Sequence, residues 1–317
     1  MNQYSKKEEW LVIINPNAGK RKGQKDWEKI SDLLIKEEFI FSEKFTEKKG
    51  HAISLAIDGI KAGFRKIISV GGDGTLNEIV NGVFSNQTCP TTDISLAMIP
   101  VGTGNDWGRM FGIPVDYEKA IKLIKDNNQI LHDIGIVDYY DNTEKRIRYF
   151  INNAGLGFES VVVRKSNIQK EKGRGGKAIY LYNLLISLIN YKNCKAEIII
   201  DGEKTNADVY TINVGNGRYC GGGMRLTPNA LTDDGILEVT VINGMGKIEI
   251  IRNLNKLYDG TILDHHKVDS YKCKRLAVSS ETLLYVQADG ETLGHTPAEF
   301  TILPASVKII YGTNIIQ

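Results

Sequence analysis

Hydrophobic and polar positions follow two different rhythms along the 317-residue chain. Up to about residue 133, short apolar runs alternate with segments of helical period. The pattern predicts strands at 10–14, 39–45, 66–70 and 94–100, and helices at 24–38, 50–62, 76–84 and 117–126. Strands separated by single helices pair in parallel through right-handed crossovers. This part of the chain therefore predicts an α/β fold with a doubly wound, mostly parallel sheet.

After about residue 133, short β-rich runs end in Gly, Asp and Asn turns, as in GILEVTVING and TLLYVQADGE. One apolar helix is predicted at 179–190 within them. This rhythm favours an antiparallel β-sandwich. We therefore expect a first domain at 1–134 and a second at 135–304, and we leave open whether the final strand, 305–317, joins the first.

Composition narrows the class of protein. Apolar residues make up 42% and charged residues 25%, which is typical of a globular chain, and the net charge of +2 gives no reason to expect nucleic acid as a partner. We find no apolar stretch long enough to span a bilayer and no apolar signal segment at the start. Four scattered cysteines without a CxxC pair favour a reducing, cytoplasmic setting.

Three glycine-rich turns carry the candidate chemistry of the first domain. NPNAGK (15–20), GGDGT (71–75) and PVGTGND (100–106) each lie at the end of a predicted strand. Open α/β sheets bind ligands at that edge, where exposed backbone N–H groups and helix N-termini attract anions. A single such turn is often only a connection, and Thr75 with Glu78 also fits a helix capping box. Three turns together predict a phosphate-binding site.

Two carboxylates lie inside these phosphate-type turns. Asp73 and Asp106 would repel a phosphate unless a cation lay between them, and Mg²⁺ commonly bridges carboxylates and phosphates. The dinucleotide fingerprint GxGxxG, with an acidic residue about 20 positions later, is not in place. The turns therefore predict a site for a nucleotide and a metal ion.

The same turns resemble the diacylglycerol kinase catalytic domain, which sphingosine and ceramide kinases share. HDIG (132–135), NNAGLGFE (152–159) and GNGRYCGGGMRLTPNALTDDGILEV (215–239) resemble the bacterial soluble lipid kinases. The resemblance covers nearly the whole chain. It implies an NAD-kinase-like nucleotide domain followed by a β-sandwich substrate domain, with the active site in the cleft between them.

The resemblance also implies roles for individual residues. ATP would be bound by Asn15, Pro16, Asn17, Ala18, Gly19, Thr46, Gly72, Asp73, Gly74, Thr75, Leu76, Asn77, Glu78 and Thr103. Lys20 and Lys177 would lie near the phosphates, and Asp73, Asp106 and Asp133 would form an acidic network for Mg²⁺ and water. A second Mg²⁺ would bind the carbonyls of Leu231 and Ile236 and the carboxylate of Asp234, where a plain Asx turn is the alternative. Asn17-Ala18 departs from the family, because many members carry Ser or Thr before the glycine.

The segment QADGE places Asp289 and Glu291 at the implied catalytic centre. Strand alternation would put both side chains on one side of a strand. We expect Glu291 to act as the base, with Asp289 orienting it or a nearby lysine, and an ordinary hairpin turn is the alternative. The similar tripeptide Asp201-Gly202-Glu203 is expected to be only a hairpin turn.

Together these features predict an ATP- and Mg²⁺-dependent lipid kinase that phosphorylates a hydroxyl of diacylglycerol or a long-chain sphingoid base. A soluble-metabolite kinase acting on NAD is the alternative. The basic segment 165–177 and the apolar helix 179–190 suit an anionic membrane surface, unless the helix simply packs in the second domain. We expect a cytoplasmic protein that meets the membrane transiently, and we leave a homodimer open.

Overall fold

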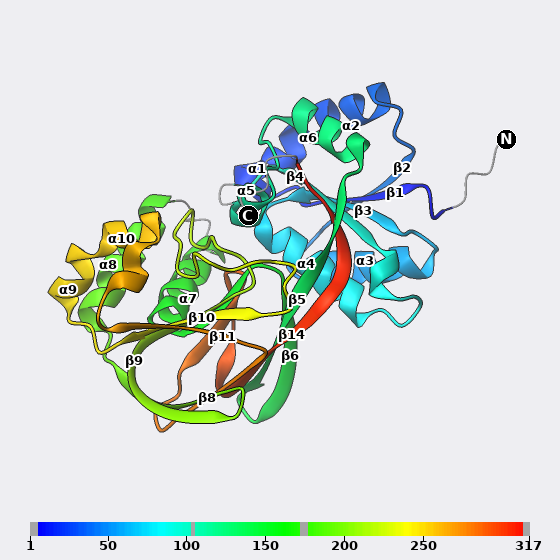
Figure 1. Ribbon diagram of the computed structural model, residues 1–317. Helices are drawn as coiled ribbons and strands as arrows, with labels where there is room; N and C mark the ends of the chain where they lie inside the picture. Colours follow the sequence, from blue (N-terminus) through cyan, green and yellow to red (C-terminus); the bar gives the residue numbers. More distant parts are fainter. Residues whose placement is uncertain (1–5, 103–104, 172–176, 313–317) are drawn as a thin grey trace. The chain divides into compact units, whose positions relative to one another are not determined.

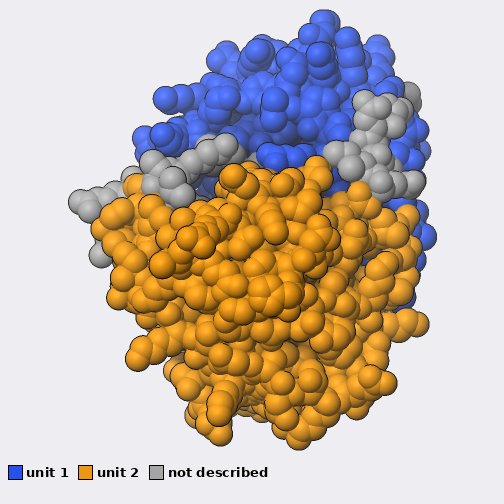
Figure 2. All heavy atoms as spheres, turned by 60° about the vertical axis from the view of Figure 1, so that its left-hand side comes forward, with its two compact units in different colours: residues 1–134, 304–317 blue, residues 135–303 orange. Residues whose placement is uncertain are grey.

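The computed structural model describes residues 6–102, 105–171 and 177–312. The chain forms two compact units, shown in different colours in Figure 2. The first unit contains residues 1–134 and 304–317, and the second contains residues 135–303. The C-terminal segment thus returns to the unit formed by the N-terminal part of the chain. We describe each unit separately.

The first unit is built on a parallel sheet with the strand order β14-β4-β3-β1-β2 (Figure 1). Its strands are β1 (Trp10–Ile14), β2 (Phe41–Phe45), β3 (Lys66–Gly71), β4 (Ser95–Pro100) and the last residues of β14 (Glu291–Ile310). Its helices are α1 (Ala18–Lys25), α2 (Trp27–Lys36), α3 (His51–Lys61), α4 (Asp73–Ser85), η1 (Thr91–Asp93), α5 (Asp106–Met110) and α6 (Tyr117–Asp126). The alternation of strands and helices that the sequence predicts is therefore present.

Burial explains why the strands of this sheet are continuously apolar rather than alternating. All five residues of β1 are buried, because helices cover both faces of the sheet. Trp10, Val12 and Ile14 pack with α2 and α6, whereas Leu11 contacts α3 near Gly59. The predicted helix 24–38 begins later, at Trp27, and the predicted helix 76–84 begins earlier, at Asp73.

The second unit is rich in antiparallel strands. They are the second half of β5 (Gln129–Asp141), β6 (Glu144–Phe150), β7 (Asn153–Gly157), β8 (Cys194–Ile200), β9 (Glu203–Gly215), β10 (Leu237–Asn243), β11 (Val268–Cys273), β12 (Arg275–Ser280), β13 (Tyr285–Ala288) and most of β14. Its helices are α7 (Phe158–Glu171), α8 (Lys177–Asn190), α9 (Lys247–Arg252), α10 (Leu254–Asp259) and η2 (Thr261–Asp264). The β-rich second part that the sequence predicts is therefore present.

The strand pairings of this unit form a closed circuit. β9 pairs with β8, β8 with β12, β12 with β14, β14 with β13, β13 with β7, and β7 with β9. The circuit encloses an apolar core that includes Phe150, Val214, Val286 and Phe300. Side chains that point away from this core lie on the outer face, and α7 packs against β7, β13 and β9 there.

Close packing of α3 against α4 predicts the effect of one substitution. A Cβ on Gly82 of α4 would lie 2.5 Å from the backbone oxygen of Ile53 and 2.7 Å from the Cβ of Ala56. Alanine favours an isolated helix over glycine by about 1 kcal/mol, but overpacking a core costs about 1–3 kcal/mol. We therefore expect Gly82→Ala to lower the free energy of unfolding measured in urea, whereas the exposed Ser85→Ala should change it little. A Gly82→Ala protein at least as stable as wild type would contradict this packing.

Candidate active site

The three glycine-rich turns meet at the carboxyl edge of the parallel sheet. The Asn15 side chain, at the end of β1, donates a 3.0 Å hydrogen bond from Nδ2 to Oγ1 of Thr75 in the second turn. The second and third turns touch through their backbones, since a Cβ on Gly102 would lie only 2.7 Å from the Cα of Gly72. Residues of different turns, 60 positions apart for Asn15 and Thr75 and 30 positions apart for Gly72 and Gly102, are therefore brought together.

The first turn holds an unusual backbone conformation. Gly19, Lys20 and Arg21 all have positive φ, at 60°, 61° and 69°. This region is unfavourable for lysine and arginine by roughly 1–2 kcal/mol per residue, and such conformations concentrate at functional sites. Gly19 also needs to lack a side chain, because a Cβ there would lie 1.9 Å from the backbone oxygen of Val101. Turns of this kind direct successive N–H groups to one side, as anion sites require.

The Asp73 carboxylate connects the second turn to the third. Its two oxygens accept hydrogen bonds from the backbone N–H groups of Asp106, at 2.9 Å, and Trp107, at 3.3 Å. These are the first residues of α5, so Asp73 stabilises the start of a helix from another turn. The sequence predicts Asp73 only as a residue for ATP and Mg²⁺. The structure adds a role in positioning Asp106.

The capping-box alternative for Thr75 and Glu78 is wrong. Helix α4 begins after Gly72, so Thr75 lies inside its first turn. The Glu78 carboxylate instead accepts hydrogen bonds from the N–H groups of Gly50, at 2.8 Å, and Ala52, at 3.2 Å. Glu78 therefore stabilises the start of α3, the neighbouring helix.

Asp133 is held in a buried hydrogen-bond network of the first unit. Its Oδ1 accepts a 2.6 Å hydrogen bond from the N–H of Ala305. The preceding His132 is fully buried: its Nε2 accepts from the Trp107 indole at 3.3 Å, and its Nδ1 hydrogen-bonds the Asp133 carbonyl. Burial lowers the pKa of His132 to about 4, so its imidazole is neutral. Asp133 is thereby linked through His132 to α5.

The remaining predicted residues of the nucleotide site lie at the same edge or outside the described residues. Pro16, Asn17 and Ala18 belong to the first turn, Thr46 directly follows β2, and Gly74, Leu76 and Asn77 lie in α4. Lys20 is exposed. Thr103 lies outside the described residues, and Lys177 begins α8 with a side chain that also lies outside them.

Asp289 and Gly290 form the two-residue turn between β13 and β14, with φ of 47° and 77°. The prediction that strand alternation places Asp289 and Glu291 on one side of a strand is therefore wrong, because Asp289 is not in a strand. Its carboxylate accepts three hydrogen bonds, of 2.8–3.0 Å, from the N–H groups of residues 151–153. Asp289 thus fixes the start of β7 to the turn.

Glu291, by contrast, is the first residue of β14 and is half-buried. It pairs with Ala288 across the hairpin. The look-alike Asp201-Gly202 forms the turn between β8 and β9, as predicted, and Ile200 pairs with Glu203 there.

The predicted second metal site lies in the turn before β10. Asp234 Oδ1 accepts a 3.0 Å hydrogen bond from the N–H of Ile236, which is the Asx turn offered as the alternative. The carboxylate is exposed, and its oxygens together with the carbonyls of Leu231 and Ile236 are ligands of the type that Mg²⁺ accepts. Among the described residues, no group of three or more His, Cys, Asp or Glu side chains is arranged to hold a metal ion. A site at Asp234 would therefore depend on backbone oxygens.

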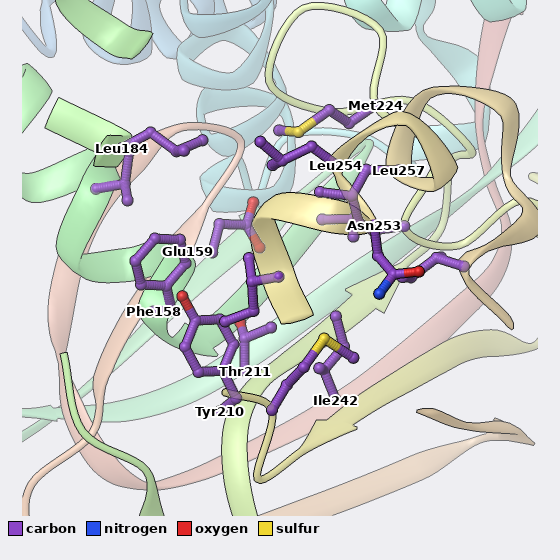
Figure 3. A pocket seen from close by; sticks show the side chains of 15 residues that line it. Phe158, Glu159, Leu184, Tyr210, Thr211, Met224, Ile242, Asn253, Leu254 and Leu257 are labelled. Atoms are coloured by element: carbon purple, nitrogen blue, oxygen red, sulfur yellow. The ribbon is translucent and has the colours of Figure 1, made fainter. Parts of the chain in front are cut away.

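An apolar cavity lies on the outer face of the second unit, between α7, α8, α9, α10 and the strands β9 and β10 (Figure 3). About 630 Å³ of unfilled space lies in and above it, part of which is open solvent, and it is lined almost entirely by aliphatic, aromatic and methionine side chains. Glu159, in the first turn of α7, is the one carboxyl group among the described residues that line it. Figure 3 shows this carboxyl among the lining side chains, between Phe158 and Leu254.

Glu159 is buried with half of its carboxyl group unpaired. Oε1 accepts a 3.2 Å hydrogen bond from Gln287 Nε2, whereas Oε2 makes no hydrogen bond within the part of the chain that the structure describes. Burial raises the pKa of Glu159 to about 8, so the group is mainly protonated at neutral pH. The sequence places Glu159 at the end of the NNAGLGFE motif but assigns it no role, because its burial is visible only in the structure.

The raised pKa of Glu159 predicts a pH dependence of stability. Between about pH 4.5 and pH 8 the folded protein keeps the proton while the unfolded chain loses it, so the free energy of unfolding falls as pH rises. The glutamine in Glu159→Gln cannot titrate. The free energy of unfolding of this variant should therefore rise relative to that of wild type, on the order of 1 kcal/mol for each pH unit in this window. Urea unfolding at pH 5, 6, 7 and 8 measures the difference. A difference that does not change with pH would contradict the burial of this carboxyl.

The position of Asp73 makes a further prediction. Asp73→Ala removes the acceptor for two N–H groups at the start of α5, and we expect it to lower the free energy of unfolding by about 1–2 kcal/mol without any nucleotide present. Asp32→Ala, which removes an exposed carboxylate on α2, is the matched control and should have little effect. Urea unfolding checks both variants. Equal stability of Asp73→Ala and wild type would show that the contact with α5 contributes nothing.

Comparison with known proteins agrees with this arrangement. The family model "Diacylglycerol kinase catalytic domain" matches residues 9–137, and the model "YegS C-terminal NAD kinase beta sandwich-like domain" matches residues 153–311. A diacylglycerol kinase of Staphylococcus saprophyticus is 30% identical over 96% of this chain and 95% of its own length.

Solved structures show the same fold. A diacylglycerol kinase from Bacillus anthracis superposes with a TM-score of 0.74 at 24% identity, covering 98% of each chain. Yeast NADH kinase superposes with a TM-score of 0.54 at 11% identity, covering 99% of this chain and 88% of its own, which is a likeness of fold alone. The matches over the full length of the chain establish that it belongs to the diacylglycerol kinase family of lipid kinases.

Proposed function

We propose that the protein is an ATP- and Mg²⁺-dependent kinase that transfers the γ-phosphate to a hydroxyl of diacylglycerol or a long-chain sphingoid base. The observation that carries this proposal is the contact between the three glycine-rich turns at one edge of the sheet, with Asp73 and Asp106 joined there. An edge that combines backbone N–H groups, a helix N-terminus and carboxylates suits a metal-bound polyphosphate.

In this proposal the first turn, residues 15–19, and the start of α4 bind the phosphates through backbone N–H groups. Lys20 and Lys177 contribute positive charge near the transferred group. Mg²⁺ would neutralise charge on the phosphate oxygens, and Asp73, Asp106 and Asp133 would hold its water shell. The structure supports this assignment by the strained backbone of the first turn and by the link from Asp73 to α5.

Glu291 is proposed as the base. It would take the proton of the lipid hydroxyl while the hydroxyl oxygen forms a bond to the γ-phosphorus and the bond from phosphorus to the ADP oxygen breaks. Asp289 would act indirectly, because its carboxylate already accepts three backbone hydrogen bonds. A second Mg²⁺ at Leu231, Asp234 and Ile236 would stabilise the turn before β10. The location of the active site between the two domains stays a prediction.

Exposed apolar side chains support contact with a lipid surface. On α8, Tyr182, Leu185 and Ile189 are 58%, 42% and 59% exposed, and their spacing places them on one side of the helix. Ile248 and Ile251 are exposed on α9, close in sequence to Lys247 and Arg252. Apolar groups beside basic ones are typical of peripheral binding to anionic membranes.

No helix among the described residues is both long and apolar enough to span a bilayer. The proposal includes transient membrane contact of a cytoplasmic protein. Helix α8 would make this contact with its exposed side, while Leu188 on its other side is buried in the second unit. Association into a homodimer also stays a prediction.

Radiolabelled ATP with a panel of acceptors tests the proposed function directly. Purified protein with Mg²⁺ would be offered diacylglycerol, sphingosine, ceramide and NAD in separate reactions. We expect label in diacylglycerol or sphingosine and none in NAD, because the likeness to NADH kinase is one of fold alone. Label in NAD, with none in any lipid, would contradict the proposal. Omission of Mg²⁺ should abolish transfer.

The two acidic residues of the QADGE turn should behave differently when changed. Glu291→Gln is nearly isosteric and should lower kcat by roughly 10² or more while leaving the Tm unchanged. Asp289→Asn should lower the Tm, because an amide cannot accept all three hydrogen bonds that the carboxylate accepts. Steady-state kinetics and thermal unfolding measure both effects.

Glu203→Gln, at the corresponding place after the Asp201-Gly202 turn, is the matched control and should leave kcat and Tm unchanged. Normal turnover by the Glu291→Gln protein would exclude Glu291 as the base.

A further inference from the structure

Helix α5, which carries Asp106 as its first residue, is too short to keep its position by itself. It has five residues, and a helix of that length is not stable without contacts to other parts of the chain. Asp73 accepts its first N–H groups, and just after its end the carbonyl of Phe111 accepts a 2.9 Å hydrogen bond from the N–H of Gly312. Distant segments therefore hold both ends of α5.

His132 holds α5 between these two ends. The Trp107 indole N–H donates a 3.3 Å hydrogen bond to Nε2 of His132. Because an indole can only donate, Nε2 carries no proton, and the proton of the neutral ring lies on Nδ1, which donates to the Asp133 carbonyl. The Phe111 ring packs against the imidazole, with the ring centroids 5.4 Å apart. One tautomer in one orientation satisfies all of these contacts.

The hydrogen bond between Trp107 and His132 joins two segments that carry carboxylates. Asp106 directly precedes Trp107, and Asp133 directly follows His132. The Asp133 carboxylate is itself fixed to β14, because its Oδ1 accepts a 2.6 Å hydrogen bond from the N–H of Ala305. The bond between the two rings therefore sets the position of Asp106 relative to Asp133.

Packing alone does not explain this pair. Trp107 and His132 are both fully buried, and two apolar side chains of similar size would fill the space without the cost of removing an imidazole from water. Buried polar groups that are fully hydrogen-bonded make one arrangement of their surroundings rigid and unique. The pair lies between two carboxylates of the candidate nucleotide site, where a unique arrangement matters for binding.

We propose that His132 and Trp107 are positioning residues for a metal-bound nucleotide: their hydrogen bond keeps Asp106 and Asp133 at the separation that the water shell of Mg²⁺ requires. The inference rests on the proposed function for the identity of the metal and the nucleotide. It adds two residues that act through the carboxylates beside them.

The coordination chemistry of Mg²⁺ gives the reason for this precision. Mg²⁺ requires nearly ideal octahedral geometry, with its oxygen ligands at about 2.1 Å, so carboxylates that hold its waters must be accurately placed. The backbone N–H groups of the first turn would bind phosphates without a metal ion. Loss of the Trp107–His132 bond should therefore weaken the binding of a nucleotide with Mg²⁺ and not the binding of the nucleotide alone.

Two substitutions break the bond and keep an aromatic ring in place. We expect His132→Phe and Trp107→Phe each to weaken the binding of ADP in the presence of Mg²⁺ by about tenfold, as changes around metal sites commonly do. Both should leave the binding of ADP without Mg²⁺ unchanged. Isothermal titration calorimetry of each protein with ADP, with and without Mg²⁺, measures the effect.

Rescue and non-additivity show whether the two residues act through their shared bond. His132→Gln places an amide oxygen near the position of Nε2 and should restore most of the Mg²⁺-dependent binding. The double variant should bind ADP with Mg²⁺ no more weakly than either single variant, because both substitutions remove the same bond. Additive effects of the two substitutions would overturn the proposal. Should His132→Phe fail to fold, His132→Asn, which keeps only the donor to the Asp133 carbonyl, takes its place.

Thr91→Val is the matched control at the other edge of the sheet. Thr91 lies in η1, before the start of β4, and its hydroxyl donates a 2.6 Å hydrogen bond to the Ser306 carbonyl. Its loss should lower the Tm and leave the binding of ADP with Mg²⁺ unchanged. If His132→Phe also lowers the Tm without any change in Mg²⁺-dependent binding, the pair only stabilises the fold and the proposal is wrong.

The outcomes distinguish this inference from the proposed function. Suppose that His132→Phe and Trp107→Phe lose Mg²⁺-dependent binding of ADP, but the wild-type protein transfers no phosphate to any lipid. The positioning role would then stand and the function would fall. Suppose instead that the wild type and both variants phosphorylate diacylglycerol with the same Mg²⁺ concentration for half-maximal activity. The function would then stand and the positioning role would fall.

Discussion

The carboxylate of Asp73 is the contact on which the arrangement of the nucleotide edge depends. It lies at the start of α4 and accepts hydrogen bonds from the first N–H groups of α5. One carboxylate therefore connects two turns that follow different strands. Without this carboxylate, the first backbone N–H groups of the five-residue helix α5 would have to find hydrogen-bond acceptors in solvent. The position of Asp106 and the packing of Trp107 against His132 follow from this contact, and through His132 it reaches Asp133.

The second unit also contains an aspartate whose carboxylate accepts hydrogen bonds from the backbone of a distant segment. Asp289 lies in a two-residue turn and binds three N–H groups at the start of β7, which joins the QADGE turn to the segment that leads into α7. Glu159 and the cavity lie at the first turn of that helix. In both units an aspartate at a glycine-containing turn accepts hydrogen bonds from the backbone of a distant segment, and a candidate chemical group, Asp106 or Glu159, lies in that segment or a few residues after it.

Periodicity was a good guide where an element is long and its burial is regular. Strand 10–14 and helix 117–126 were predicted with the residues that the structure shows, because five consecutive apolar residues and a clean helical period are strong local signals. Helix α5 has neither, and it is stabilised by a side chain 33 residues earlier in the chain. Glu78 was placed in its own helix start for the same reason, since nothing local shows that it binds the start of α3.

Some candidate residues can be recognised from the local sequence, and others only from their surroundings in the structure. Glycine-rich turns are visible in a sequence because their composition is unusual, whereas Glu159 stands out only because the structure buries it with Oε2 making no hydrogen bond among the described residues. A crystal structure of the protein with Mg²⁺ and ADP tests the central claim most directly. The account predicts the diphosphate within hydrogen-bonding distance of the backbone N–H groups of the first turn and of the start of α4, with a metal ion near Asp73 or Asp106. A diphosphate bound elsewhere, with these turns empty, would contradict it.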